Sequence, residues 1–281
     1  MPEPSLATTV RWALRGDLVS RRFNLRRMVS KKAWFMLPAK WKAVPVGGLQ
    51  RLGSEYDGGY LVTRRSVEAS TLLLSMGLND DWQFEADFLK SNPAARVVCF
   101  DHTVNFRFWV LYTLKQAVRL RLVQSFKSWS YKRFFSRSNA EHRKLCIGYD
   151  VPGGVSVRSL FNEFPDRAIF LKIDIEGSEY RILDAIVEHA DRVTGIVIEL
   201  HDVDLQRQRI ENFVNGLDGF TVVFSHANNF ASVDEQGDPL VIELALIRNE
   251  YLDEYQPGSP APQISPNDPA QPDIELVFEP A

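Results

Sequence analysis

The stretch IFLKIDIEGSEY at residues 169–180 decides the fold. Its first five residues are apolar except for Lys172 and run into Asp174, which predicts a short buried strand ending at an acid. A turn follows, and apolar residues then recur at three-to-four spacing after Ser178, which predicts a helix opening there. Ligands of open α/β sheets bind beyond the carboxyl ends of such strands, so Asp174 and Glu176 lie where a site is expected. Helix capping and dipole compensation would explain the same two acids.

Length and composition are those of an ordinary globular protein. The 281 residues are 45% hydrophobic and 25% charged, which fits one large α/β domain with extensions or two small ones. The net charge is only −3, but residues 1–150 hold 25 of the 33 Lys and Arg and 12 of the 36 Asp and Glu. This asymmetry indicates an anionic partner for the first part, either an acidic substrate or an anionic membrane surface, or else a solvated basic face.

The compartment is expected to be the cytoplasm. Cys99 and Cys146 both stand in apolar runs, which is typical of small core residues in a reducing environment. No apolar stretch reaches the roughly 18–20 residues of a membrane span, and no secretory signal is visible at the N-terminus. The basic and aromatic segments allow peripheral contact with the inner membrane face as a further expectation.

The chain is expected to have three regions. Residues 1–45 are basic and aromatic, and they predict an N-terminal arm over the domain, or else a surface-seeking amphipathic segment. Residues 46–250 form the main domain, with an aromatic and basic insertion at about 104–144 that is either a partly buried cap or a contact for substrate or a surface. Residues 251–281 are a Pro-rich strap in which IELVF at 274–278 is a candidate docking strand.

Six further strand patterns accompany the central one. They are residues 71–77, 96–101, 145–150, 195–200, 220–225 and 239–248. The last two lie too close in sequence for a helical crossover, so they should pair antiparallel. Repeated strand and helix followed by a final hairpin predict an α/β fold with a class I methyltransferase (Rossmann-like) sheet. Such a sheet is mostly parallel with an antiparallel last strand, and helices cover both of its faces.

The loop after residues 71–77 restricts the cofactor. It reads S-M-G-L-N-D-D and lacks the G-x-G-x-x-G of dinucleotide sites, which disfavours an NAD-dependent oxidoreductase. Asp101 ends the next strand, 24 residues after Gly77. An acid at this place accepts hydrogen bonds from ribose hydroxyls, so Asp101 is predicted to bind a nucleoside.

Several motifs in the right order resemble those of FkbM-type methyltransferases. KIDIEGSEYRIL at 172–183 and IVIELH at 196–201 resemble the family as a whole. Four others resemble a methyltransferase-like branch of it: LGSEYDGGYLV at 52–62, LSMGLNDDWQFEADF at 74–88, FDHT at 100–103 and SHANNF at 225–230. The likeness covers about residues 50–250.

The resemblance implies S-adenosylmethionine as cofactor. Ser75 and Gly77 would lie beside its amino-acid part, Asp101 at its ribose, and Asp174 near the methyl group. Family members generally make O-methyl groups, often on sugars, so the implied acceptor is a sugar hydroxyl of a glycolipid or polysaccharide. No nucleic-acid motif appears, so no nucleic-acid partner is expected. A non-catalytic binding module with the same fold is the alternative, although it would not need the acids described next.

A hydroxyl acceptor has to lose a proton, so a general base or a metal ion is needed. Asp174, Glu199, His201 and His226 are the predicted catalytic residues, because they follow strand ends. Asp174, Glu199 and His201 are also the predicted ligands of a divalent cation such as Mg²⁺. Each histidine is alternatively the base or a buried structural residue.

Overall fold

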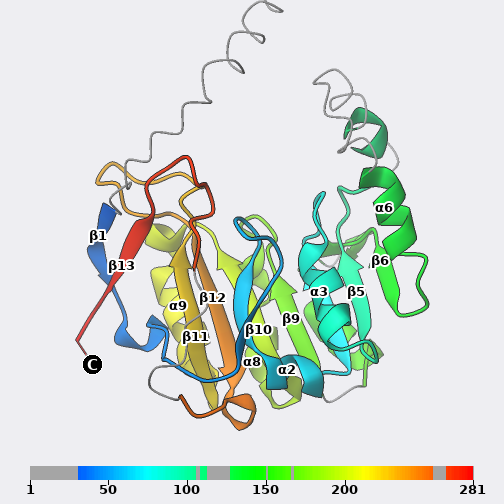
Figure 1. Cartoon of the computed structure of the whole chain (residues 1–281), viewed down its shortest axis with the longest axis horizontal. Coiled ribbons are helices and arrows are strands. Elements are labelled where there is room, and N and C mark those ends of the chain that lie inside the picture. The colour runs from blue at the N-terminus through cyan, green and yellow to red at the C-terminus, as the bar shows by residue number, and fades with distance from the viewer. Residues whose placement is uncertain are drawn as a thin grey trace, which may run out of the picture.

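A seven-stranded sheet forms the centre of the molecule (Figure 1). The computed structural model describes residues 31–105, 108–112, 127–149, 151–165, 168–255 and 264–280. The strand order is β11-β12-β10-β9-β4-β5-β6. The strands are β4 (Leu72–Met76), β5 (Arg96–Phe100), β6 (Ala140–Arg143), β9 (Ile169–Ile173), β10 (Val193–Leu200), β11 (Phe220–Ala227) and β12 (Ile242–Arg248).

The pairing confirms the predicted α/β sheet. β12 is antiparallel to both β10 and β11. The other neighbours are all parallel. The carboxyl ends of the parallel strands therefore meet at one edge, the upper edge in Figure 1. The antiparallel final hairpin lies at one side of the sheet, as the short connection between its strands requires.

The alternation of side chains along β9 explains why this stretch decides the fold. All five of its residues are buried. Ile169, Leu171 and Ile173 pack into the core on one face of the sheet, and Phe170 packs into the core on the other. A strand covered on both faces needs an almost continuous apolar run, which IFLKI provides.

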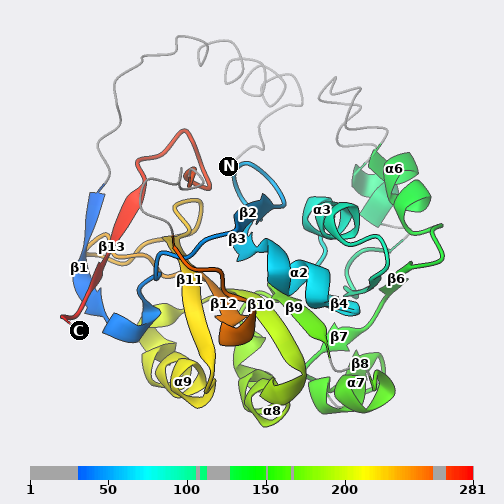
Figure 2. The same cartoon turned by 60° about the horizontal axis from the view of Figure 1, so that its bottom comes forward.

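Helices cover both faces of the sheet (Figure 2). One face carries α7 (Val157–Glu163), α8 (Leu183–Glu188) and α9 (Val203–Gly216). The other carries α2 (Arg64–Ala69), α3 (Gln83–Ser91) and the hairpin of β2 (Leu49–Leu52) with β3 (Tyr60–Thr63). Short 3-10 helices are η1 (Ala39–Trp41), η2 (Glu179–Arg181), η3 (Ala190–Arg192) and η4 (Asn249–Tyr251). No helix in the described ranges is long and apolar enough to cross a membrane.

Two local predictions are wrong. Residues 145–150 hold only a two-residue strand, β7 (Cys146–Ile147), which pairs with β8 (Gly154–Val155) in a separate two-stranded sheet and is not part of the main one. The sheet strand is β6, whose sequence AEHR has one buried residue and therefore no apolar run. The helix expected from Ser178 is also broken, since a 3-10 turn precedes α8 and directs the Glu179 side chain into the interior.

The described part of the insertion packs on the domain. α6 (Lys127–Phe134) and residues 108–112 place Tyr131 and Trp109 against Trp82, with ring centroids 5.9 and 6.1 Å apart. This packing agrees with a partly buried cap. Residues 113–126 of the insertion and residues 1–30 of the predicted N-terminal arm lie outside the described residues.

The predicted docking of residues 274–278 is confirmed. They form β13 (Ile274–Phe278), which pairs in parallel with β1 (Lys31–Leu37). The turn before β13 is held by Asn229, whose amide donates to the carbonyls of Asp268 at 3.0 Å and Pro272 at 3.2 Å. The C-terminal segment, residues 264–280, is therefore fixed beside the ends of β11 and β12.

An imidazole strengthens this attachment. His226 lies 3.2 Å from Asp273 of the C-terminal segment and 3.4 Å from Glu243 of β12. Burial alone would lower the pKa of His226, but the two carboxylates raise it to about 9. The folded protein therefore holds this proton more tightly than the unfolded chain does.

We expect this attachment to make stability depend on pH. The unfolded histidine titrates near pH 6.5, so the stabilisation is complete below about pH 6.5 and is lost as the pH rises through about 9. Its size is up to about 3 kcal/mol. Urea unfolding of the wild type and of His226→Gln between pH 6 and 10 measures it. Equal slopes of the unfolding free energy against pH in the two proteins would contradict the assignment.

Candidate functional site

A cavity of about 630 Å³ opens at the carboxyl ends of β4, β5 and β9. Gly77 and Asp101 follow β4 and β5 on its wall, and Asp174 follows β9. Ile147 of β7 and Tyr149 after it give part of the wall an apolar character. The cavity wall thus has an apolar part, a carboxylate after β5 and further acids after β9.

Asp101 is an ionised carboxylate on this wall. Its Oδ2 accepts from the backbone N–H groups of Leu78 at 3.1 Å and Asn79 at 2.8 Å. Its Oδ1 accepts from the N–H of Thr103 at 2.8 Å and from the hydroxyl of Thr103 at 2.6 Å. Burial would raise the pKa of Asp101, but these hydrogen bonds lower it below its usual value. Because a carboxylate has about four acceptor positions, a ribose hydroxyl has to share or replace one of these donors.

Ser75 and Gly77, two of the predicted cofactor-binding residues, lie in different surroundings. Ser75 is fully buried in β4, donates its hydroxyl to Glu85 and is not among the residues that line the cavity. Gly77 does line the cavity, with φ +89°. The space that its missing Cβ leaves is taken by the backbone carbonyl of Asp174. The glycine is thus required for β4 and β9 to approach each other at their ends.

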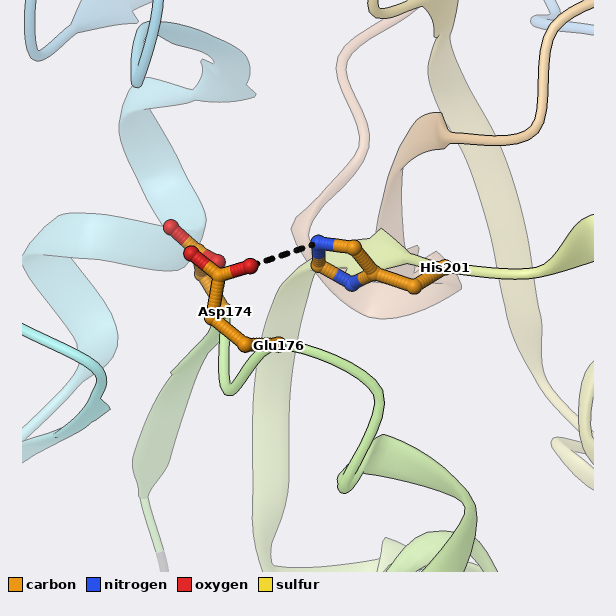
Figure 3. A group of neighbouring side chains, drawn as sticks. All are labelled: Asp174, Glu176 and His201. Carbon is orange, nitrogen blue, oxygen red and sulfur yellow. Dashed lines mark ion pairs between the residues drawn. The ribbon is translucent and has the colours of Figure 1, made fainter. Parts of the chain in front are cut away.

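Three side chains with metal-ligating atoms converge at the end of β9. Two of them, Asp174 and His201, are predicted ligands, and the third is Glu176. Asp174, Glu176 and His201 point toward one another (Figure 3), and one ligand atom from each lies within 4.8 Å of the others. Nε2 of His201 is 3.5 Å from the Glu176 carboxylate. Glu176 reaches this position from a left-handed backbone conformation with φ 53°. Two carboxylates and an imidazole in this arrangement suit a divalent cation or a shared proton.

Glu179 orients the imidazole, and sequence reasoning missed it. Its buried Oε1 lies 3.2 Å from Nδ1 of His201 and accepts from the N–H groups of Ile175 at 3.0 Å and Gly177 at 3.2 Å. Burial lowers the pKa of His201, but the Glu179 carboxylate, with further acids nearby, raises it to about 9. A carboxylate on one ring nitrogen fixes the tautomer and leaves Nε2 for chemistry or a metal. The only sequence signal was an acid in the turn that resembled a helix start.

Glu199 lies near this cluster but is bound elsewhere. Its Oε1 accepts a hydrogen bond from Asn228 at 2.7 Å, and it is not part of the group around His201. Burial, followed by the charges of Asp174 and Glu243, raises the pKa of Glu199 to about 9. Burial also raises the pKa of Asp174, to about 6. Negative charge therefore exceeds positive charge at this edge, and a proton or another cation relieves it.

His226 is not brought to the cluster. Its ring is taken up by Glu243 and Asp273, as described above, so it acts as a structural residue. Of the predicted catalytic residues, Asp174 and His201 lie in the cluster, Glu199 lies near it, and His226 belongs to the attachment of the C-terminal segment. The alternation of strands and turns predicted which sheet edge these residues share. It did not indicate which of them lie side by side.

Part of the chain matches the model of a known protein family. The model described as methyltransferase FkbM domain matches residues 123–235. The predicted resemblance to FkbM-type methyltransferases is confirmed. A methyltransferase domain of this family uses S-adenosylmethionine, the cofactor that the sequence predicts. Comparison with curated proteins gave no match.

Several solved structures are similar in part. An rRNA methylase from Streptococcus thermophilus is 13% identical, with 66% of this chain and 90% of that chain covered and a TM-score of 0.36. A precorrin-6y C5,15-methyltransferase from Geobacter metallireducens is 11% identical, with 66% and 84% covered and a TM-score of 0.35. A fibrillarin pre-rRNA processing protein from Methanococcus jannaschii is 9% identical, with 72% and 88% covered and a TM-score of 0.35. Likenesses at this level say nothing of what this chain acts on.

The role of Glu179 can be measured on His201. We expect Glu179→Gln to lower the pKa of His201 from about 9 by more than one unit, because the charge that offsets burial is removed. NMR titration of the imidazole resonances gives this value. His189 serves as an internal control, because its ring hydrogen-bonds to the backbone carbonyl of Ala185 and not to Glu179. A pKa that stays near 9 in the variant would assign the shift to the other acids.

Proposed function

We propose that the protein transfers a methyl group from S-adenosylmethionine to a hydroxyl, in first place a sugar hydroxyl of a glycolipid or polysaccharide. The observation that carries this proposal is the cavity that begins at Asp101 and ends at the Asp174–Glu176–His201 cluster. A methyl donor lying along the cavity would bring its reactive end to the residues able to take or replace a proton. The match to a methyltransferase domain supports the same reaction type.

The lining of the cavity fits the cofactor. Ile147 and Tyr149 offer an apolar surface for the adenine ring, and Asp101 offers a carboxylate for the ribose. Of the four donors on Asp101, the Thr103 hydroxyl is the one that rotates most freely, so a ribose hydroxyl would replace it. When bound, the cofactor supplies an electrophilic methyl group on a sulfonium. The protein's contribution to such an in-line displacement is chiefly alignment.

His201 and Glu179 are suited to handle the acceptor proton. Glu179 occupies Nδ1, so Nε2 is the atom that faces Glu176. The surrounding acids raise the pKa of His201 to about 9 and so stabilise its protonated form. His201 has to lose that proton before Nε2 can accept the proton of the acceptor hydroxyl. Glu199, whose raised pKa keeps it protonated near neutral pH, would add no further negative charge beside the reaction. This set of roles retains His201 and Glu199 from the predicted residues, adds Glu179 and leaves out His226.

The same cluster is suited to a divalent cation. Asp174, Glu176 and His201 would hold it, with Glu176 taking the place that the sequence assigned to Glu199. A cation there would lower the pKa of the acceptor hydroxyl and replace the excess protons of the site. His201 would then be a ligand instead of a base. Its carboxylate partner on Nδ1 is common for metal-bound histidines.

The insertion is a candidate contact for a bulky acceptor. On its described part, Trp129 is 61% exposed and Leu111 is 67% exposed. An aromatic and basic surface of this kind would contact a glycan or a lipid-linked sugar, and it would also serve peripheral contact with an anionic membrane. The neighbouring cofactor cavity makes this the side from which a large acceptor would approach.

Cofactor binding tests the first part of the proposal. Asp101→Ala should weaken binding of S-adenosylmethionine by on the order of 2–4 kcal/mol, because one or two charge-assisted hydrogen bonds are lost. Isothermal titration calorimetry gives the affinity. Asp218→Asn, at an exposed acid in the turn before β11, is the control for loss of one negative charge. Unchanged affinity in the Asp101 variant would remove this residue from the cofactor site.

Metal binding tests the second part. We expect the chelator-treated protein to bind Mn²⁺, and both Glu176→Gln and His201→Ala to weaken that binding at least tenfold. Electron paramagnetic resonance of free Mn²⁺ measures this without an acceptor. Glu235→Gln changes an exposed acid in the loop between β11 and β12 and should have no effect. Unchanged Mn²⁺ affinity in both cluster variants would leave His201 as a base without a cation.

A further inference from the structure

A second, smaller cavity adjoins the first at the same edge of the sheet. It measures about 260 Å³ and shares Gly77, Asn79 and Asp174 with the larger cavity. Its own walls include Asp57 and Lys127, which come from the β2–β3 turn and from the first residue of α6. A group bound here would therefore meet a group bound in the larger cavity at Asp174.

Asp57 is the exposed end of a hydrogen-bonded network. Its Oδ1 accepts from the amides of Asn228 at 3.2 Å and Asn267 at 3.1 Å. Asn228 also donates to Glu199 at 2.7 Å, and Asn267 donates to Glu243 at 2.8 Å. The four residues behind Asp57 are all buried, whereas Asp57 itself is exposed. The network thus fixes one carboxylate at the wall of the cavity.

The network reaches the C-terminal segment through Asn267. Its amide donates to Asp57, and its buried Oδ1 atom accepts no hydrogen bond within the described part of the chain. Asn267 belongs to the C-terminal segment, which lies above the ends of β11 and β12 (Figure 1). That segment thus helps to hold the Asp57 carboxylate at the wall of the cavity.

The chemistry of the walls favours a neutral ligand rich in hydroxyl groups. Gln83 and Lys127 line the cavity together with the Asp57 carboxylate and bring N–H donors to its wall, although the Gln83 amide also donates to Asp87 at 3.0 Å. Lys127 is already paired with Asp80 at 3.0 Å, and Lys172 donates to the carbonyl of Gly77 at 3.0 Å, so neither cation is free to neutralise an anionic group. A hydroxyl group both donates and accepts hydrogen bonds. A ligand with several hydroxyl groups can therefore bind to neighbouring donors and acceptors on the wall without adding charge.

We propose that the second cavity is the acceptor site and that Asp57, held by Asn228 and Asn267, binds hydroxyl groups of a sugar-like acceptor there. This inference rests on the proposed methyl transfer. Donor and acceptor would then occupy adjoining cavities, with Asp174 at their junction. Asp57 would be the acceptor-binding carboxylate, and the two asparagines would be positioning residues that act through it.

The probes are methyl glycosides of rhamnose, mannose, glucose and galactose. Their binding to the full chain saturated with S-adenosylhomocysteine is measured by saturation-transfer NMR, and the affinity for S-adenosylmethionine is measured separately by calorimetry. We expect at least one glycoside to bind, Asp57→Asn to weaken it at least fivefold, and cofactor affinity to stay within twofold. Asp191→Asn is the matched control, because this exposed aspartate precedes β10 at the opposite edge of the sheet.

Asn267 provides a second readout. Asn267→Ser should weaken the same glycoside while cofactor affinity stays unchanged, whereas a purely structural role would lower only the thermal midpoint. Glycoside affinity that is equal in the wild type and Asp57→Asn would overturn the assignment of Asp57. A tenfold loss of cofactor affinity in Asp57→Asn would assign the second cavity to the donor. Binding of none of the glycosides would overturn the sugar-like class, and failure of the wild type to bind S-adenosylmethionine would instead refute the proposed function.

Discussion

The close contact between the ends of β4 and β9 is the constraint on which the site depends. Gly77 has no side chain, so the carbonyl of Asp174 lies against it. Lys172, buried in β9, donates to the Gly77 carbonyl at 3.0 Å and lies 3.7 Å from the carboxylate of Glu85 in α3. Burial lowers the pKa of Lys172, but Glu85 raises it above its usual value, so the ammonium stays charged. Removing either Lys172 or Glu85 would leave the other as an unpaired buried charge. This would lower the free energy of unfolding far more than the loss of an exposed ion pair would.

This contact also connects the two halves of the proposed chemistry. One cavity lies beside Gly77 toward Asp101, and the other lies beside it toward Asp57. Asp174 borders both cavities because it is the first residue beyond the β9 end of the contact. Burial raises the pKa of Glu199 to about 9 and that of Asp174 to about 6, so near neutral pH Glu199 holds a proton while Asp174 is mostly ionised. A site that stores protons in this way is suited to exchange them for a cation or to pass one on.

Periodicity predicted most of the sheet, because strands buried on both faces need apolar runs such as IFLKI. It missed β6, an edge strand with a polar sequence, for the same physical reason. Strand ends predicted Asp101 and Asp174 on one edge of the sheet. The partners of these groups were not predictable, because Asp57 and Asn267 are 210 residues apart and meet only in the folded chain. Glu179 was missed because its local sequence has the form of an ordinary helix start, whereas its side chain turns inward.

The pairing of β1 with β13 has a consequence for the order in which the protein folds. Lys31 lies opposite Ile274, so this two-stranded sheet joins residues separated by most of the described chain. Contacts of such long sequence separation form late, because a long loop has to close first. All strands of the seven-stranded sheet lie between β1 and β13 in the sequence. The sheet and the wall around Asp101 would therefore form first, and the contact between Asn267 and Asp57 would form last.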